Sequence, residues 1–165
     1  MSVKPGCIQK ILFRAAGPNP AIPSLRGKVA GKLDGKPINV GDVRFGEPSK
    51  HAFISLKIVG WTEDKMRAMA KLKAWLVKHA PVLRRAKAEK WIEVHTYLLP
   101  NQGYEQIGFT TELMKAAISA DCHLDNTCYA LITPRDSMHH KLLKTWEEMK
   151  RPTRRRSLRR VPRRN

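Results

Sequence analysis

The sequence predicts an α+β fold: a ferredoxin-like or related mixed or antiparallel sheet packed by helices, with a C-terminal helix and an arginine-rich extension. Residues 51–59 and 91–99 alternate apolar and polar side chains with a period of two, which is typical of half-buried strands. Residues 62–80 instead repeat apolar side chains at helical spacing. Residues 151–165 are rich in arginine and have almost nothing apolar to bury, so we expect no independent fold there.

One folded domain accounts for most of the chain. The 165 residues suit a single core, and an apolar content of 42% excludes a wholly disordered protein. We expect the α+β domain in residues 1–134, the C-terminal helix in residues 135–150 and the basic tail in residues 151–165.

The net charge of +18 at pH 7 is far above that of an ordinary globular domain. A charge of that size attracts polyanions, so the predicted partner is nucleic acid or an anionic surface. No apolar run is long enough for a membrane span, and residues 1–10 lack the apolar centre of a signal peptide. Three cysteines without framework spacing indicate free thiols in a reducing compartment, by default the cytoplasm.

The first third of the chain is predicted to alternate short strands with turns. Residues 7–14 form a strand, and residues 21–26 form at most a short helix, because Pro23 removes a backbone donor. Residues 27–45 are rich in glycine and lysine and are expected to run as a long loop or hairpin that ends in a short strand, 38–45.

The longest helix is predicted to begin at Thr62, with Glu63 and Asp64 in its first turn, where the helix dipole favours anions. Pro81 ends or kinks it, with a further turn in residues 82–90 as the open alternative. Its buried stripe is expected to consist of Met66, Met69, Leu72, Leu76, Val77 and Ala80. The opposite face carries Arg67, Lys71 and Lys78, with Trp75 near their edge. That basic face is either a solvated helix surface or a phosphate-binding surface.

Residues 91–131 are predicted to form a strand, a glycine-bearing loop, a helix and a second strand. Ile92, Val94 and Thr96 share the buried side of the first strand. The helix begins after Thr110 or Thr111. Its apolar stripe is expected to hold Leu113, Met114, Ala117 and Ile118.

This part of the chain resembles a family of small bacterial domains of unknown function. The matching positions are Gly108, Phe109, Thr110, Glu112, Leu113, Leu124 and Tyr129. The resemblance covers roughly residues 8–131 and implies an α+β domain. It implies no activity and therefore no site residues.

The basic tail contributes nine of the chain's positive charges from residue 150 onward, with no acid among them. Guanidinium groups pair bidentately with phosphate and stack on bases, so this composition favours contact with nucleic acid. An anionic membrane or an acidic protein groove is the alternative. The tail residues predicted to bind nucleic acid are Arg151, Arg154, Arg155, Arg156, Arg159, Arg160, Arg163 and Arg164.

The predicted order of strands and helices also looks like that of RNA-recognition motifs, which stack bases on aromatic side chains of two strands. Phe13 and Phe53 are the aromatic candidates here. Lys50 stands where such a motif has glycine, and His51 replaces an aromatic residue, so a core role for both phenylalanines is favoured over base stacking.

Catalysis has no signature in the sequence. Cys122, Cys128, His139 and His140 are residue types that bind zinc, but their spacing matches no standard site. His95 shares a strand face with Glu93, as a general base would with its orienting carboxylate, yet no nucleophile or phosphate loop accompanies it. We therefore expect no enzyme activity, no metal and no cofactor.

The predicted function is non-catalytic binding of RNA or DNA backbone through the basic tail and the basic helix face, within a ribonucleoprotein or nucleoprotein complex. The alternative is a protein-interaction module, such as a phage-type inhibitor that binds an acidic surface of a host or defence protein. An undetected enzyme comes third.

Overall fold

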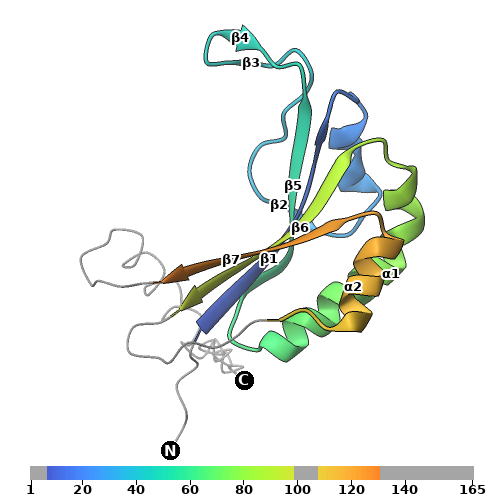
Figure 1. The fold of residues 1–165 in the computed structure, drawn as a ribbon. Helices are drawn as coiled ribbons and strands as arrows, with labels where there is room; N and C mark the ends of the chain where they lie inside the picture. The colour runs from blue at the N-terminus through green and yellow to red at the C-terminus, as the bar shows by residue number, and fades with distance from the viewer. Residues whose placement is uncertain (1–6, 99–107, 131–165) are drawn as a thin grey trace, which may run out of the picture. The chain divides into compact units, whose positions relative to one another are not determined.

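The computed structural model describes residues 7–98 and 108–130, all within one compact unit (Figure 1). The expected C-terminal helix at 135–150 and the basic tail at 151–165 lie outside the described residues.

A five-stranded sheet forms the centre of the domain, with the strand order β2-β5-β1-β6-β7. β1 lies in the middle and pairs antiparallel with β5 on one side and β6 on the other, whereas β6 and β7 are parallel. The predicted α+β class with a mostly antiparallel sheet is thus confirmed. The strands are β1 (Cys7–Gly17), β2 (Lys32–Leu33), β5 (Ala52–Thr62), β6 (Glu89–Leu98) and β7 (His123–Ala130).

Two helices, α1 (Lys65–Arg85) and α2 (Thr111–Ser119), lie side by side and cover one face of the sheet (Figure 1). A short 3-10 helix, η1 (Ile22–Gly27), follows β1 and buries Ile22 and Leu25. The core lies between the helices and the sheet. It includes Phe13 of β1, Ile54 and Leu56 of β5, Ile92 and Val94 of β6, and Leu72, Leu76 and Leu113 of the helices.

The strand predicted at 38–45 does not join this sheet. Ile38 makes a single bridge to Phe53, and the chain then leaves the sheet as a separate hairpin of β3 (Val43–Arg44) and β4 (Glu47–Pro48), which projects from one end of the domain (Figure 1). The carboxylate of Asp42 accepts a hydrogen bond from the backbone N–H of Asn39 at 2.8 Å, and Gly41 has a left-handed φ of 91°. This turn breaks the extended run that the sequence pattern indicates.

The start and the length of α1 also differ from the prediction. Asp64 is the cap, because its carboxylate accepts a hydrogen bond from the N–H of Arg67 at 2.9 Å. Thr62 belongs to the end of β5. Pro81 lies inside the helix, which continues to Arg85.

The buried side of α1 is rotated from the predicted stripe. Met66 and Val77 are 82% and 61% exposed, so both assignments to the core were wrong. Trp75, which the sequence places near the basic face, is only 7% exposed, and its ring packs on Phe13. The residues buried from this helix are Ala68, Leu72, Trp75, Leu76, His79 and Leu83.

The predicted cap of α2 is confirmed, since the hydroxyl of Thr110 accepts a hydrogen bond from the N–H of Leu113. Its apolar stripe is only half right. Met114 and Ile118 are exposed, while the alanine side of the helix packs on the fold. The residues buried there are Leu113, Ala116, Ala117 and Ala120.

Candidate nucleic-acid interface

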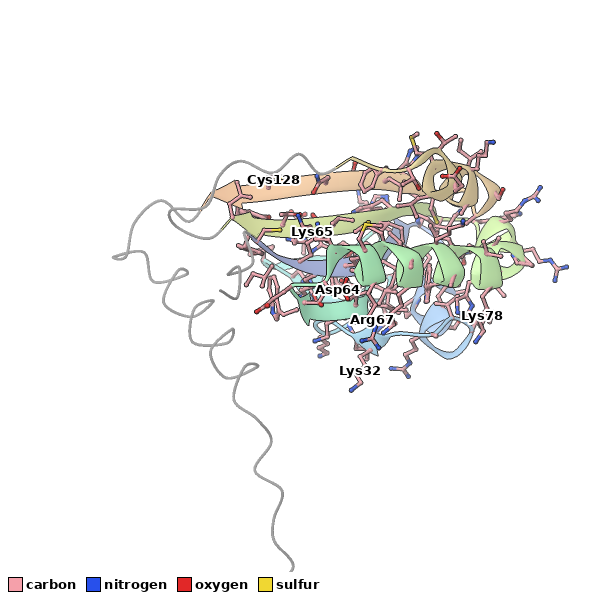
Figure 2. The ribbon with its side chains drawn as sticks, turned by 90° about the horizontal axis from the view of Figure 1, so that it is seen from below. Lys32, Asp64, Lys65, Arg67, Lys78 and Cys128 are labelled. Atoms are coloured by element: carbon pink, nitrogen blue, oxygen red, sulfur yellow. The ribbon has the colours of Figure 1, made fainter. Side chains whose placement is uncertain are left out.

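The outer side of α1 carries the three cations that the sequence predicted. Arg67, Lys71 and Lys78 are four and seven residues apart, spacings that return to the same side of a helix with 3.6 residues per turn. All three are exposed, and none forms an ion pair with a described residue. Arg67 and Lys78 point away from the body of the domain (Figure 2).

A loop that precedes β2 is held against this helix. The indole Nε1–H of Trp75 donates to the backbone carbonyl of Ala30, and the N–H of Ala30 donates to Nε2 of His79 at 3.2 Å. Two exposed lysines lie on either side of Ala30 in sequence: Lys28, which lines a surface pocket with Val82 and Arg85 of α1, and Lys32 at the start of β2. Figure 2 shows Lys32 on the same side of the domain as Arg67.

These five cations, Lys28, Lys32, Arg67, Lys71 and Lys78, are here named the basic surface. They come from two segments that are far apart in sequence but are joined by hydrogen bonds. Ordered elements therefore hold the backbone positions of these cations, which suits contact with several phosphates better than a loose run of lysines.

His79 docks the loop as a neutral imidazole. Burial lowers its pKa from the usual value of 6.5, and the nearby ammonium of Lys78 lowers the pKa further. An imidazole nitrogen can accept a hydrogen bond only when it carries no proton, as Nε2 does here from Ala30. Protonation of His79 would thus remove one of the two side-chain hydrogen bonds that hold the loop, while the bond from Trp75 would stay.

The positive surplus is not restricted to the tail. The described residues contain 19 lysines and arginines against 10 aspartates and glutamates. Within α1 itself the charged residues are all basic: Lys65, Arg67, Lys71, Lys73, Lys78, Arg84 and Arg85.

The other face of the sheet carries a row of packed aromatic rings. The centroids of Trp61 and Tyr97 are 5.0 Å apart, and Tyr97 stacks on Tyr129 at 4.6 Å. Burial raises the pKa of Tyr97, and Tyr129 and Glu93 raise it further. Tyr97 is only 9% exposed, so its ring is a packing surface rather than an open platform.

The base-stacking hypothesis fails for Phe13. This side chain is fully buried in the core beneath α1, on the opposite side of the sheet from the aromatic row. Phe53 does lie on the helix-free side and packs near Trp91, with the ring centroids 6.4 Å apart.

His95 lies in an ion-pair cluster on the same sheet face. Oε2 of Glu93 is 2.7 Å from Nη1 of Arg14 and 2.9 Å from Nε2 of His95. Both contacts are ion-pair distances without hydrogen-bond geometry, since neither Oε2 of Glu93 nor Nε2 of His95 has a hydrogen-bond partner among the described residues. Arg14 thus competes for the carboxylate that would orient His95 as a base.

The cysteines behave as separate thiols. Cys122 is buried, and burial raises its pKa to about 12, whereas Cys128 is exposed on the edge strand β7 (Figure 2). Within residues 7–98 and 108–130, no group of three or more His, Cys, Asp or Glu side chains could hold a metal ion. His139 and His140 lie outside the described residues.

The structure brings together three of the predicted site residues, Arg67, Lys71 and Lys78. The predicted tail arginines from Arg151 to Arg164 lie outside the described residues. Lys28 and Lys32 were missed, although they belong to the lysine-rich segment that the sequence already singles out. Nothing local to that segment indicates its contact with α1.

Comparisons with protein-family models, curated proteins and solved structures give no match for this chain. None of the helices in the described part of the chain is long and apolar enough to cross a membrane.

Proposed function

We propose that this chain is a non-catalytic protein that binds the phosphate backbone of RNA or DNA through the basic surface and the arginine-rich tail, in the cytoplasm, as a subunit of a larger nucleoprotein complex. The observation that carries the proposal is the basic surface. Five exposed cations occupy two docked segments, and the helix among them contains no acid to neutralise them.

Such a surface binds by neutralising phosphates and releasing their counterions. The affinity then depends little on base sequence and falls steeply with salt. Five phosphate contacts alone predict a loss of about 10²–10³-fold in affinity between 50 and 200 mM salt, and tail contacts add to that loss.

Within the α+β class, we propose a ferredoxin-like topology, the strand and helix order that RNA-recognition motifs also have. β5 and β6 flank β1, α1 connects them, and β2 continues the sheet beyond β5, all of which supports it. The 3-10 helix in place of a first α-helix and the additional strand β7 depart from it.

The test is binding of 20-nucleotide single-stranded RNA, single-stranded DNA and duplex DNA by fluorescence anisotropy, across a salt series. The full chain is compared with the triple variant Arg67→Gln/Lys71→Gln/Lys78→Gln and with a chain ending at Met149. The salt slope is the slope of the logarithm of the binding constant against the logarithm of the salt concentration. We expect the triple variant to reduce the magnitude of this slope by about three, and the truncation to reduce it more.

Lys36→Gln/Lys50→Gln/Lys115→Gln is the matched control, because it removes the same charge from exposed positions outside the basic surface. An equal effect of the two triple variants would mean that net charge alone attracts the nucleic acid. Salt-independent binding, or no binding at 50 mM salt, would contradict the proposal.

The second candidate is a protein-interaction module that binds an acidic surface of a host or defence protein. The projecting β3–β4 hairpin favours it, because such an arm serves protein contacts. Co-purification from native cells separates the two functions: a protein partner that both the full chain and the truncation at Met149 retain after nuclease treatment supports the second.

A further inference from the structure

The tip of the β3–β4 hairpin exposes apolar side chains. Phe45 is fully exposed, at 106% of its reference area, and Val43 is 73% exposed. Pro48 pairs opposite Val43 and is exposed as well. Single exposed apolar residues are ordinary, but three on one small projection make a contact surface. Val43, Phe45 and Pro48 are here named the apolar tip.

The backbone at Phe45 is strained in a way that packing does not explain. Arg44 pairs with Glu47, so Phe45 and Gly46 form a two-residue connection, and their φ angles are 51° and 88°. A turn with positive φ at both central residues normally takes Asn-Gly or Asp-Gly. An aromatic residue is unfavourable in that left-handed region, and its exposed ring gains no contact within the domain in return.

Backbone hydrogen bonds fix the base of the hairpin. Gly41 donates to the carbonyl of Ser49 at 2.8 Å, and Ser49 donates to that of Asp42 at 2.9 Å. Two backbone hydrogen bonds of 2.9 Å also join Ile38 and Phe53 at the sheet edge. A short isolated hairpin would be marginal in water, so these bonds give the apolar tip a defined position before any partner binds.

The charges around the apolar tip argue against a polyanion. The hairpin carries two acids, Asp42 and Glu47, and one base, Arg44, in a chain whose net charge is +18. Valine and proline side chains cannot stack on bases as an aromatic ring can. An apolar pocket of a protein accepts all three residues of the tip, as the desolvated aromatic anchors of protein interfaces do.

We propose that the β3–β4 hairpin is a docking arm whose apolar tip inserts into an apolar pocket of a protein partner, with Arg44 beside an acidic group at the pocket rim. This site is separate from the basic surface, so it does not depend on the binding of nucleic acid.

The first experiment replaces Phe45 by the photocrosslinking analogue p-benzoylphenylalanine in the full chain, expressed in its native cells. The same analogue at Val77, which is 61% exposed on α1, is the control. We expect one discrete protein adduct from position 45 that survives nuclease treatment and is absent from position 77.

The captured protein is then purified and titrated with the unmodified chain and with Phe45→Asn. Asparagine suits the left-handed turn, so the hairpin is retained while the anchor is lost. We expect Phe45→Asn to weaken binding about ten-fold or more without lowering the melting temperature, and Val77→Asn to leave the affinity unchanged.

Four results would overturn the docking arm. These are the absence of a discrete adduct at position 45, an adduct that nuclease removes, an adduct with the mass of two copies of this chain, and an affinity that Phe45→Asn leaves unchanged. The second result would assign the tip to nucleic acid and the third to self-association.

Discussion

Nε2 of His79 accepts a hydrogen bond from the backbone N–H of Ala30, 49 residues earlier in the chain, at a distance of 3.2 Å. With the bond from Trp75 to the carbonyl of the same residue, it ties the loop before β2 to α1. Two lysines of the basic surface, Lys28 and Lys32, lie two residues before and after this contact.

The free energy of unfolding is expected to fall at acidic pH because His79 becomes protonated. Its pKa is lowered in the folded protein, so below the unfolded value of 6.5 the unfolded chain binds the proton more readily than the folded one. The contribution of the neutral imidazole is thus complete above pH 6.5 and is lost as the pH falls below that value. Urea unfolding at pH 7.5 and 5.5 measures it.

His79→Leu is the comparison variant. It should lower the unfolding free energy by about 1–2 kcal/mol at pH 7.5, because the N–H of Ala30 loses its acceptor. It should also flatten the pH dependence below 6.5. A pH profile that this variant leaves unchanged would show that another group titrates.

The docked loop is expected to contribute directly to nucleic-acid affinity. Lys28→Gln/Lys32→Gln should lower the salt slope of oligonucleotide binding by about two, since each lysine accounts for one phosphate. Lys36→Gln/Lys115→Gln, also at exposed positions, is the control and should leave the slope near its original value. Equal slopes for the two double variants would exclude the loop from the interface.

Thiol reactivity should separate the three cysteines. At pH 8 the thiol of Cys122, whose pKa of about 12 results from burial, is ionised in only about one molecule in 10⁴. Cys7 is buried as well, and Cys128 is exposed. Ellman's reagent should therefore titrate one thiol rapidly in the native protein and three in denaturant, and Cys128→Ser should abolish the rapid phase. A rapid phase that persists in this variant would place an accessible thiol elsewhere.

Lys90 is expected to stabilise the junction between α1 and β6. Its buried ammonium donates to the carbonyls of Ala86 and Ala88 at 3.0 and 2.9 Å and lies 2.9 Å from a carboxylate oxygen of Asp121. Lys90→Met removes the side-chain donor to both carbonyls, of which that of Ala86 keeps the N–H of Ala88, so we expect a loss of about 1–3 kcal/mol in urea unfolding.

Asp121→Asn tests the other half of that contact. The carboxylate is largely exposed, and its pKa is lowered by the hydrogen bond and the charge of Lys90. Its contribution is present above pH 3.8 and is lost on further acidification. Asparagine tolerates the left-handed backbone at this position (φ 55°), so the variant should unfold almost as the parent does at pH 7. If Asp121→Asn lost as much unfolding free energy as Lys90→Met, the ion pair and not the bonds to the two carbonyls would account for the contribution of Lys90.

Phe45→Asn is also a stability test. Relief of the strained turn should raise the unfolding free energy by about 1 kcal/mol, because asparagine adopts positive φ at lower cost. A decrease would show that the ring of Phe45 packs within the domain after all.

Local periodicity predicted the strands well. In β6 the alternation of Ile92, Val94 and Thr96 with polar neighbours corresponds to the observed burial, because one face of that strand meets the helices. The predicted buried stripe of α1 differs from the observed one because a loop 45 to 49 residues earlier helps to bury Trp75 and His79. The sequence around these two residues does not indicate that contact.

The candidate site was predictable to a similar extent. Helical spacing alone places Arg67, Lys71 and Lys78 on one side of α1. Lys28 and Lys32 lie near α1 through tertiary contacts, those of Ala30 with the helix and the pairing of β2 with β5. The sequence predicts a strand at 38–45 in place of the β3–β4 hairpin, because the extended residues 43–44 look the same in sequence whether they pair within the sheet or in a separate hairpin.

The position of β1 determines when the domain can assemble during synthesis. It is the first described strand to leave the ribosome, yet it forms the middle of the sheet and pairs with two strands that arrive later, at Ala52–Thr62 and Glu89–Leu98. Until β6 has emerged, its apolar residues and one of its edges stay uncovered. Contacts this distant in sequence slow folding and give the nascent chain time to aggregate. Whether the first half of the domain aggregates during translation therefore depends on how soon the second half becomes available to pair with it.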